Sequence, residues 1–246
     1  MIPTLSSSIF KSLVKAVQAG IQMKPRSADD KEYFAQDWFS QRVIEAGFVP
    51  HLQGRNSYPD FWVEGNGITE GYEIKALAHL DNGKPARADI DFNSTIPCGI
   101  KEGKNVFLVF FLYKGTGSQL RTITSVAMVH GNLINCDEQL PRFHRNESIP
   151  EFGPYAQGFI RNRKMYRFPH PFSEDESFLN RLRLVVPSEW SLPLDGLQRT
   201  GQITRKIAQE HIVGYEINLY GQEVRILKEG TPEANKTRVF DVFEAV

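Results

Sequence analysis

The sequence lacks the compositional features that would assign it to a class at once. Its 246 residues carry 29 basic and 29 acidic side chains, so no overall positive charge indicates nucleic-acid binding, and any basic surface must be local. The two cysteines, Cys98 and Cys136, are too few for a disulfide framework and do not form a CxxC pair. The six histidines include no HxxxH pair, which argues against a zinc site.

Long apolar segments are absent as well. No run reaches the roughly 18 apolar residues of a membrane-spanning helix, and the longest, residues 106–113, has the length of a buried strand. The first residues contain no charged segment followed by an apolar stretch, so no signal peptide is indicated. With 41% hydrophobic and 24% charged residues, we expect a globular cytoplasmic protein with no membrane partner.

The most informative feature that is present is the pair Asn66-Gly67 between two apolar runs. Asn-Gly in this setting is the strongest short-range signal for a two-residue hairpin turn. A hairpin with this turn places Asp60 directly opposite Glu73, with Cβ atoms about 4.5–5.5 Å apart on one face of the sheet. Because side chains alternate along a strand, Lys75 belongs to the same face. Two carboxylates and one ammonium group are therefore predicted to converge.

Two carboxylates at this separation repel each other unless a proton or a cation lies between them. A hard divalent metal suits this position, since Mg²⁺ takes oxygen ligands at about 2.0–2.1 Å and usually keeps several waters. A lysine beside two carboxylates should stay protonated, which favours an electrostatic role over that of a base. The alternative is an ordinary exposed strand with a cluster of mixed charges.

Four residues resemble, one for one, the motif of the PD-(D/E)xK nuclease superfamily, which includes most type II restriction endonucleases. They are Pro59, Asp60, Glu73 and Lys75. The resemblance implies that Asp60 and Glu73 bind one or two Mg²⁺ ions per active site, together with the backbone carbonyl of Ile74. It also implies that Lys75 orients the attacking water or helps to deprotonate it.

The resemblance covers roughly residues 28–113 and implies an α/β (α+β) fold. We expect a restriction-endonuclease-like core, in which helices flank a central mixed sheet, with an additional C-terminal β-rich region. Residues 1–135 would hold the N-terminal helices and the catalytic core. Residues 136–246 would form a DNA-recognition and dimerisation extension that packs on the core, so that the two parts make one compact domain.

Periodicity and turn residues predict the individual elements. A serine should cap the first helix, Ser27 should cap the second, and Gly47 should end the second. The predicted helices are 6–21, 28–46 and one near 196–209; the predicted strands are 48–52, the hairpin around Asn66-Gly67, 105–113, 119–130, 182–186, 212–219, 222–228 and 237–244. A polar loop over 78–103 is long enough to indicate a function.

A further acidic residue often comes from the helix before the hairpin in this superfamily. Asp37 and Glu32 are the two candidates, and either could serve a second metal ion. For each of them the alternative is a solvated acid on the surface of a helix.

Basic residues interleaved with aromatic residues over 141–172 suit a surface that follows a phosphate backbone. The alternative is a loop that covers the core with its aromatic side chains. A second basic stretch lies near 199–206, and arginine can read guanine edges. The candidate DNA-binding residues are Asn93, Ser94, Arg161, Arg163, Lys164, Arg199 and Arg205.

The functional hypothesis is a Mg²⁺-dependent, sequence-specific type II restriction endonuclease that cuts double-stranded DNA. A homodimer is favoured, since a cut in both strands needs two active sites or two successive events. One alternative is a structure-selective nuclease of DNA repair or recombination. Another is a DNA-binding module of the same fold that does not cleave, although the intact Asp60, Glu73 and Lys75 argue against it.

Overall fold

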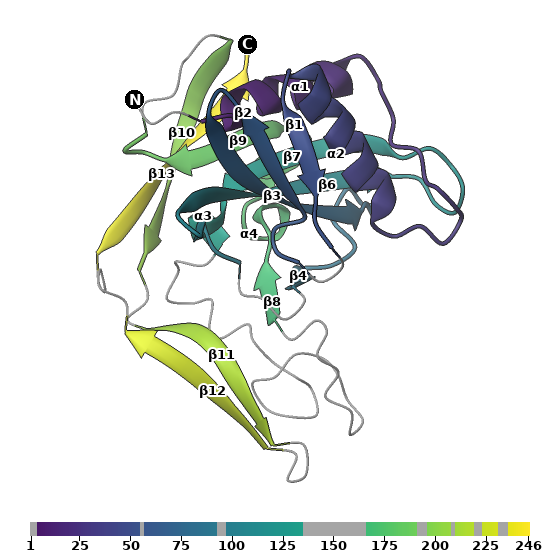
Figure 1. Cartoon of the computed structure of the whole chain (residues 1–246). Coiled ribbons are helices and arrows are strands. Elements are labelled where there is room, and N and C mark those ends of the chain that lie inside the picture. Colours follow the sequence, from purple (N-terminus) through teal and green to yellow (C-terminus); the bar gives the residue numbers. More distant parts are fainter. Residues whose placement is uncertain are drawn as a thin grey trace.

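A computed structural model of the chain describes residues 4–54, 57–92, 97–134, 166–190, 196–207, 210–218, 223–230 and 236–246. Within these ranges the chain folds around one nine-stranded mixed sheet flanked by few helices (Figure 1). The predicted α+β class with a central mixed sheet is therefore confirmed. No helix in these ranges combines the length and the apolar composition needed to span a bilayer.

The sheet contains strands from both halves of the chain. From edge to edge it runs through β1 (Val49–Leu52), β2 (Phe61–Gly65), β3 (Ile68–Ala78), β6 (Lys104–Lys114), β7 (Thr122–His130), β9 (Leu182–Pro187), β13 (Thr237–Ala245) and β10 (Leu197–Lys206), and β5 (Ile100–Lys101) pairs with β6. The pairs β3–β6 and β7–β9 are parallel, and the other pairs are antiparallel. The C-terminal strands thus extend the sheet that contains the hairpin.

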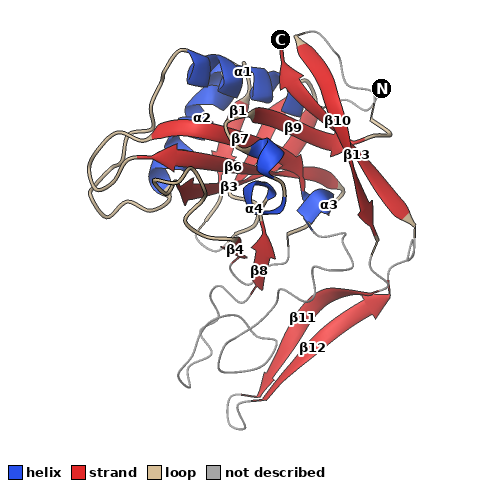
Figure 2. Ribbon diagram, turned by 180° about the vertical axis from the view of Figure 1, so that it is seen from behind, coloured by secondary structure: helices blue, strands red, loops and turns tan. Residues whose placement is uncertain are grey.

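Each face of the sheet has its own cover. The helices α1 (Ser6–Gln18) and α2 (Tyr33–Glu45) pack on one face. The opposite face carries α3 (Gly131–Ile134), α4 (Pro171–Glu174), the 3₁₀ helix η2 (Glu176–Phe178) and a small sheet of β4 (Asp89–Phe92) and β8 (Tyr166–Pro169), as the view from behind shows (Figure 2). The predicted loop over 78–103 therefore contains β4 and β5.

Strand β6 lies at the centre and is buried on both sides. Phe107 and Phe111 point into the core under α1 and α2, while Leu108 and Phe110 point into the core on the other face; all four are fully buried. A strand with two buried faces is apolar at every position rather than at every second one. This explains the long apolar run in the sequence.

The start of α1 differs from the prediction. No serine caps it; instead the carboxylate of Glu70, on β3, accepts hydrogen bonds from the backbone N–H of Leu5 at 3.1 Å and the hydroxyl of Thr4 at 2.6 Å. A carboxylate at a helix N-terminus satisfies free N–H groups and opposes the positive end of the helix dipole. The predicted serine cap was wrong because a residue distant in sequence takes that role.

Helix α2 begins five residues later than predicted. The carboxylate of Asp30 accepts the backbone N–H groups of Tyr33 at 2.9 Å and Glu32 at 3.2 Å, so Asp30 rather than Ser27 supplies the capping oxygen. The prediction that Gly47 ends the helix is confirmed, since Gly47 follows the last turn with a positive φ of 87°.

The C-terminal region is rich in strands, as predicted, but the helix predicted near 196–209 was wrong. That segment forms β10, which pairs along its length with β13. The strands β11 (Glu210–Asn218) and β12 (Glu223–Gly230) form a separate two-stranded sheet that extends away from the main sheet (Figures 1 and 2).

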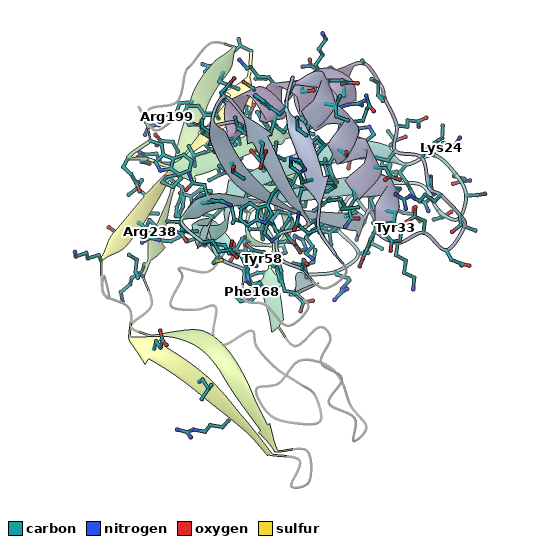
Figure 3. All side chains as sticks on the ribbon, viewed as in Figure 1. Lys24, Tyr33, Tyr58, Phe168, Arg199 and Arg238 are labelled. Atoms are coloured by element: carbon teal, nitrogen blue, oxygen red, sulfur yellow. The ribbon has the colours of Figure 1, made fainter. Side chains whose placement is uncertain are left out.

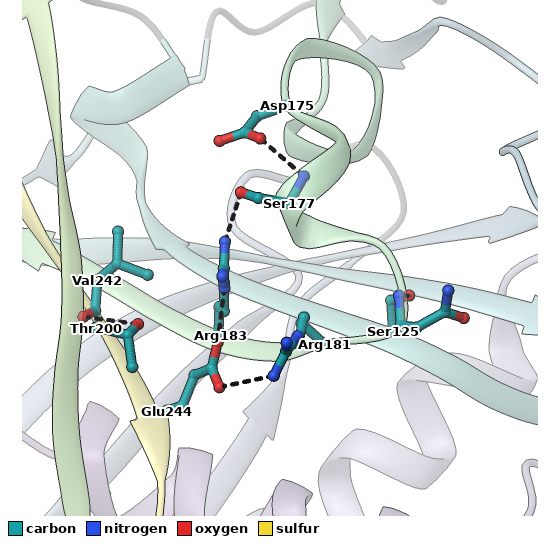
Figure 4. Close-up of polar contacts among 9 residues, drawn as sticks. Ser125, Asp175, Ser177, Arg181, Arg183, Thr200, Val242 and Glu244 are labelled. Carbon is teal, nitrogen blue, oxygen red and sulfur yellow. Dashed lines mark hydrogen bonds and ion pairs between the residues drawn. The ribbon is translucent and has the colours of Figure 1, made fainter.

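A polar network joins β9, β13 and η2 on the face of the sheet opposite to α1 and α2 (Figure 4). Arg183 donates to Glu244 at 2.9 Å and to the hydroxyl of Ser177 at 2.6 Å, and Arg181 lies 3.5 Å from the second oxygen of Glu244. Because Arg183 and Glu244 are largely buried, these charge-assisted bonds help to fix the register of the C-terminal strands.

Candidate active site

The candidate site is built on the β2–β3 hairpin. The two turn residues, Asn66 and Gly67, both have positive φ values, 51° and 74°. Positive φ at both central positions defines a type I′ turn, whose twist matches that of the strands. The two strands pair Phe61 with Tyr72, which is the register predicted from the turn. The predicted register is confirmed.

Asp60 immediately precedes β2 and meets Glu73 across the hairpin. The backbone N–H of Asp60 donates to Glu73 Oε2 at 3.1 Å, and Asp60 Oδ2 accepts the backbone N–H of Ile74 at 2.7 Å. Lys75 Nζ lies 2.7 Å from Glu73 Oε1. The side chain of Glu73 is only 7% exposed and that of Lys75 only 19%. The hairpin therefore brings the two carboxylates and the ammonium group together in a largely buried position.

The electrostatics of the group reflect this crowding. Burial, followed by the nearby charge of Glu73, raises the pKa of Asp60 from 3.8 to about 7, although Lys75 opposes the shift. Burial lowers the pKa of Lys75, but the charges of Glu73 and Asp60 outweigh burial, so its pKa is raised overall. Lys75 therefore stays charged at neutral pH, while Asp60 holds a proton for much of the time when no cation is bound.

Helix α2 and Glu32, the residue immediately before it, contribute one group each. Gln36 Nε2 donates to Asp60 Oδ1 at 3.1 Å, and the negative charge of Glu32 raises the pKa values of both Asp60 and Lys75. Asp37 instead forms a two-pronged ion pair with Arg26, with N–O distances of 2.5 and 2.7 Å. Of the two predicted helical acids, Glu32 acts on the hairpin carboxylate. The contact of Gln36 was not predicted, and no local sequence signal indicates it.

The segment before Asp60 is held by a neighbouring loop. The hydroxyl of Tyr58 donates to the Cys98 carbonyl at 2.8 Å and accepts the Cys98 backbone N–H at 3.0 Å. Lys101 Nζ donates to the Tyr58 backbone carbonyl. Cys98 is a free thiol whose pKa is raised by burial, and Cys136 lies outside the described residues.

The predicted DNA-binding residues fall into two groups. Arg199 and Arg205 lie on β10, at the opposite edge of the main sheet from the β1 side, and each pairs with an acid: Arg199 with Asp241 at 3.0 Å, and Arg205 with Glu174. Figure 3 shows Arg199 well away from Tyr58, which lies near the candidate site. The remaining candidates lie outside the described residues: Asn93, Ser94, Arg161, Arg163 and Lys164.

The donor set fits a magnesium ion. Among the described residues no group of three or more His, Cys, Asp and Glu side chains is arranged to hold a metal, so Asp60 and Glu73 form a two-carboxylate set. Two carboxylates suffice for Mg²⁺, which keeps several waters. The raised pKa of Asp60 fits as well, because a cation would relieve the repulsion from Glu73 that contributes to the shift.

Comparison of the chain with protein-family models and with curated proteins found no match to either. The geometry of the hairpin therefore carries the functional argument.

Proposed function

We propose that this chain is a Mg²⁺-dependent endonuclease of the PD-(D/E)xK type that hydrolyses phosphodiester bonds of double-stranded DNA. The observation that carries the proposal is the juxtaposition of Asp60 and Glu73, with Lys75 Nζ 2.7 Å from Glu73 Oε1. The order of elements supports it too: a helix, a hairpin and two strands, as expected of a restriction-endonuclease-like core, correspond to α2, β2–β3, β6 and β7.

Hydrolysis of a phosphodiester requires a positioned water and compensation of the charge that develops on the phosphate oxygens. A bound magnesium ion would supply Lewis acidity toward the phosphate and make a water molecule more acidic. Asp60 and Glu73, with the Ile74 carbonyl as a third ligand, would hold the ion. Gln36 orients the carboxylate of Asp60 through its hydrogen bond to Oδ1.

Lys75 provides a fixed positive charge beside this site. Because its pKa is raised, Lys75 remains protonated at neutral pH and acts by orienting the water and stabilising developing negative charge. The protein environment thus favours the electrostatic role of Lys75 over that of a general base.

We propose that the enzyme cuts DNA at a specific sequence, as type II restriction endonucleases do, and that a homodimer cuts both strands. A structure-selective repair nuclease would use the same catalytic residues. The substrate distinguishes them: a site-specific enzyme gives discrete fragments from any DNA that contains its site, whereas a structure-selective enzyme requires branches or ends.

The test is cleavage of plasmid DNA and of branched and linear duplexes, with and without Mg²⁺. We expect products only with Mg²⁺ and a loss of about 100-fold or more in rate for Asp60→Asn and Glu73→Gln, since each removes a group that stabilises the transition state. Glu64→Gln is the matched control, because Glu64 is an exposed acid on β2, four residues after Asp60. Undiminished cutting by Glu73→Gln would refute the assignment.

A further inference from the structure

A second hairpin places two lysines beside the chain that carries Asp60. Strands β5 and β6 pair Lys101 directly with Lys104. The residues between them, Glu102 and Gly103, have φ values of 52° and 73°, which is again the pattern of a type I′ turn. Residues directly opposite each other share a face and have Cβ atoms about 4.5–5.5 Å apart. The turn therefore holds two like charges close together.

Each lysine lies against a residue two positions from Asp60. Lys101 Nζ donates to the backbone carbonyl of Tyr58 and lies 5.8 Å from the centre of its ring. Lys104 Nζ lies 4.9 Å from the centre of the Trp62 ring. Tyr58 precedes Asp60 by two residues and Trp62 follows it by two, so the two lysines contact the chain before and after the candidate catalytic aspartate.

Neither charge is neutralised within the part of the chain that the structure describes. There, Lys75 pairs with Glu73, and the more distant Lys84 pairs with Glu176, but Lys101 and Lys104 contact only a carbonyl oxygen and aromatic rings. Both lysines are only partly exposed. Like charges directly opposite each other destabilise a hairpin. An arrangement that costs stability and leaves two ammonium groups against the chain segment that carries Asp60 suits the binding of an anionic substrate.

We propose that Lys101 and Lys104 bind two backbone phosphates of the DNA strand whose phosphodiester lies at Asp60 and Glu73. The inference rests on the proposed function, because it takes DNA as the substrate. One strand of a duplex carries a charge about every 3.4 Å along its axis, so neighbouring phosphates can engage two closely spaced side chains. The lysines would fix the position of the strand and would carry no information about base sequence.

The test measures DNA binding without cleavage. A fluorescent duplex is titrated with protein in EDTA, over a series of salt concentrations from about 50 to 200 mM. The double variant Lys101→Gln/Lys104→Gln keeps the length of both side chains and removes both charges. We expect the slope of log affinity against log salt to become shallower by about 2, and affinity near 100 mM salt to fall roughly 10- to 60-fold.

Two control variants make this result specific. Lys114→Gln removes an exposed lysine from the other end of β6 and should leave affinity and slope unchanged. Lys101→Arg/Lys104→Arg retains both charges and should retain the salt slope. The melting temperature of the double glutamine variant should stay level or rise, since a repulsive pair is removed. A lower melting temperature with an unchanged salt slope would show a purely structural role and overturn the inference.

The outcomes for the two proposals are separable. If the double glutamine variant binds with the wild-type slope while Glu73→Gln abolishes cleavage, the phosphate-binding inference is wrong and the nuclease proposal stands. If the double variant loses binding but the wild-type protein cuts nothing with Mg²⁺, the phosphate-binding pair stands and hydrolysis is refuted. A wild-type protein that binds no duplex in EDTA would overturn the phosphate-binding pair.

Discussion

Replacing Asp60 by asparagine should make the metal-free protein more stable than the native chain at neutral and alkaline pH. The pKa of Asp60 is about 7 in the folded protein against 3.8 for the unperturbed group. A difference of about three units corresponds to roughly 4 kcal/mol of unfolding free energy. This is the stability that the native chain gives up to keep an ionised Asp60 in a buried position, first because of burial and then because of the nearby charge of Glu73.

The sign follows from proton binding. Because the folded state holds the Asp60 proton more tightly than the unfolded state, its contribution to stability is complete below about pH 4. The contribution declines as the pH rises toward the folded pKa near 7, and it is lost above that value. Asparagine does not titrate and keeps an acceptor for the Ile74 N–H, so the variant lacks this decline.

Urea denaturation in EDTA at about pH 5, 6, 7 and 8 measures this difference, with Glu64→Gln as the control for an exposed acid. The free energy of unfolding of Asp60→Asn minus that of the native chain should grow with pH and level off above pH 7. Mg²⁺ at about 100 times its Kd should then stabilise the native chain by about 2.7 kcal/mol at pH 8 and the variant much less. A difference that does not change with pH would refute the electrostatic reasoning.

Three further changes test other parts of the structure. Glu70→Ala should cost about 3 kcal/mol in urea denaturation because it leaves three donors without their acceptor, and a loss below about 1 kcal/mol would contradict that role. Gly67→Ala should cost about 1–2 kcal/mol by the same measurement, since φ is 74° there; an unchanged midpoint would argue against the type I′ turn. Glu32→Gln should weaken Mg²⁺ binding in calorimetry while Asp37→Asn should not, and the reverse order would assign the helical acid to Asp37.

The hairpin could be predicted from sequence because its determinants are local. Asn66 and Gly67 tolerate the positive φ values of a type I′ turn, and a two-residue turn fixes the register of every pair that follows. The meeting of Asp60 with Glu73 was a direct consequence of that register. The central strand was also accessible, since an apolar run of this short length suits a strand that is buried on both faces.

Elements that depend on distant partners could not be predicted. The acceptor at the start of α1 is Glu70, which lies 65 residues beyond Leu5 in the chain. The segment 197–206 is polar and mostly exposed, and its strand conformation comes from pairing with β13 near the C-terminus. Local propensity carries no information about either contact.

Among the residues around the site, too, some have a local sequence signal and others depend on a distant contact. Gln36 reaches Asp60 only because α2 packs across the hairpin, and no pattern in the helix marks it. Lys101 and Lys104 did have a local signal: they flank Glu102-Gly103, and a glycine between two charged strand ends favours a tight turn. That signal is weaker than Asn-Gly because glutamate rarely adopts a positive φ.

Everything proposed for this site requires that Asp60 and Glu73 jointly hold a divalent cation beside Lys75. Anomalous diffraction from crystals soaked in Mn²⁺, which takes the same oxygen ligands as Mg²⁺, tests it most directly. We expect a metal peak in contact with both carboxylates in the native protein and no peak there in Glu73→Gln. A metal bound elsewhere, or a site that survives the loss of Glu73, would contradict it.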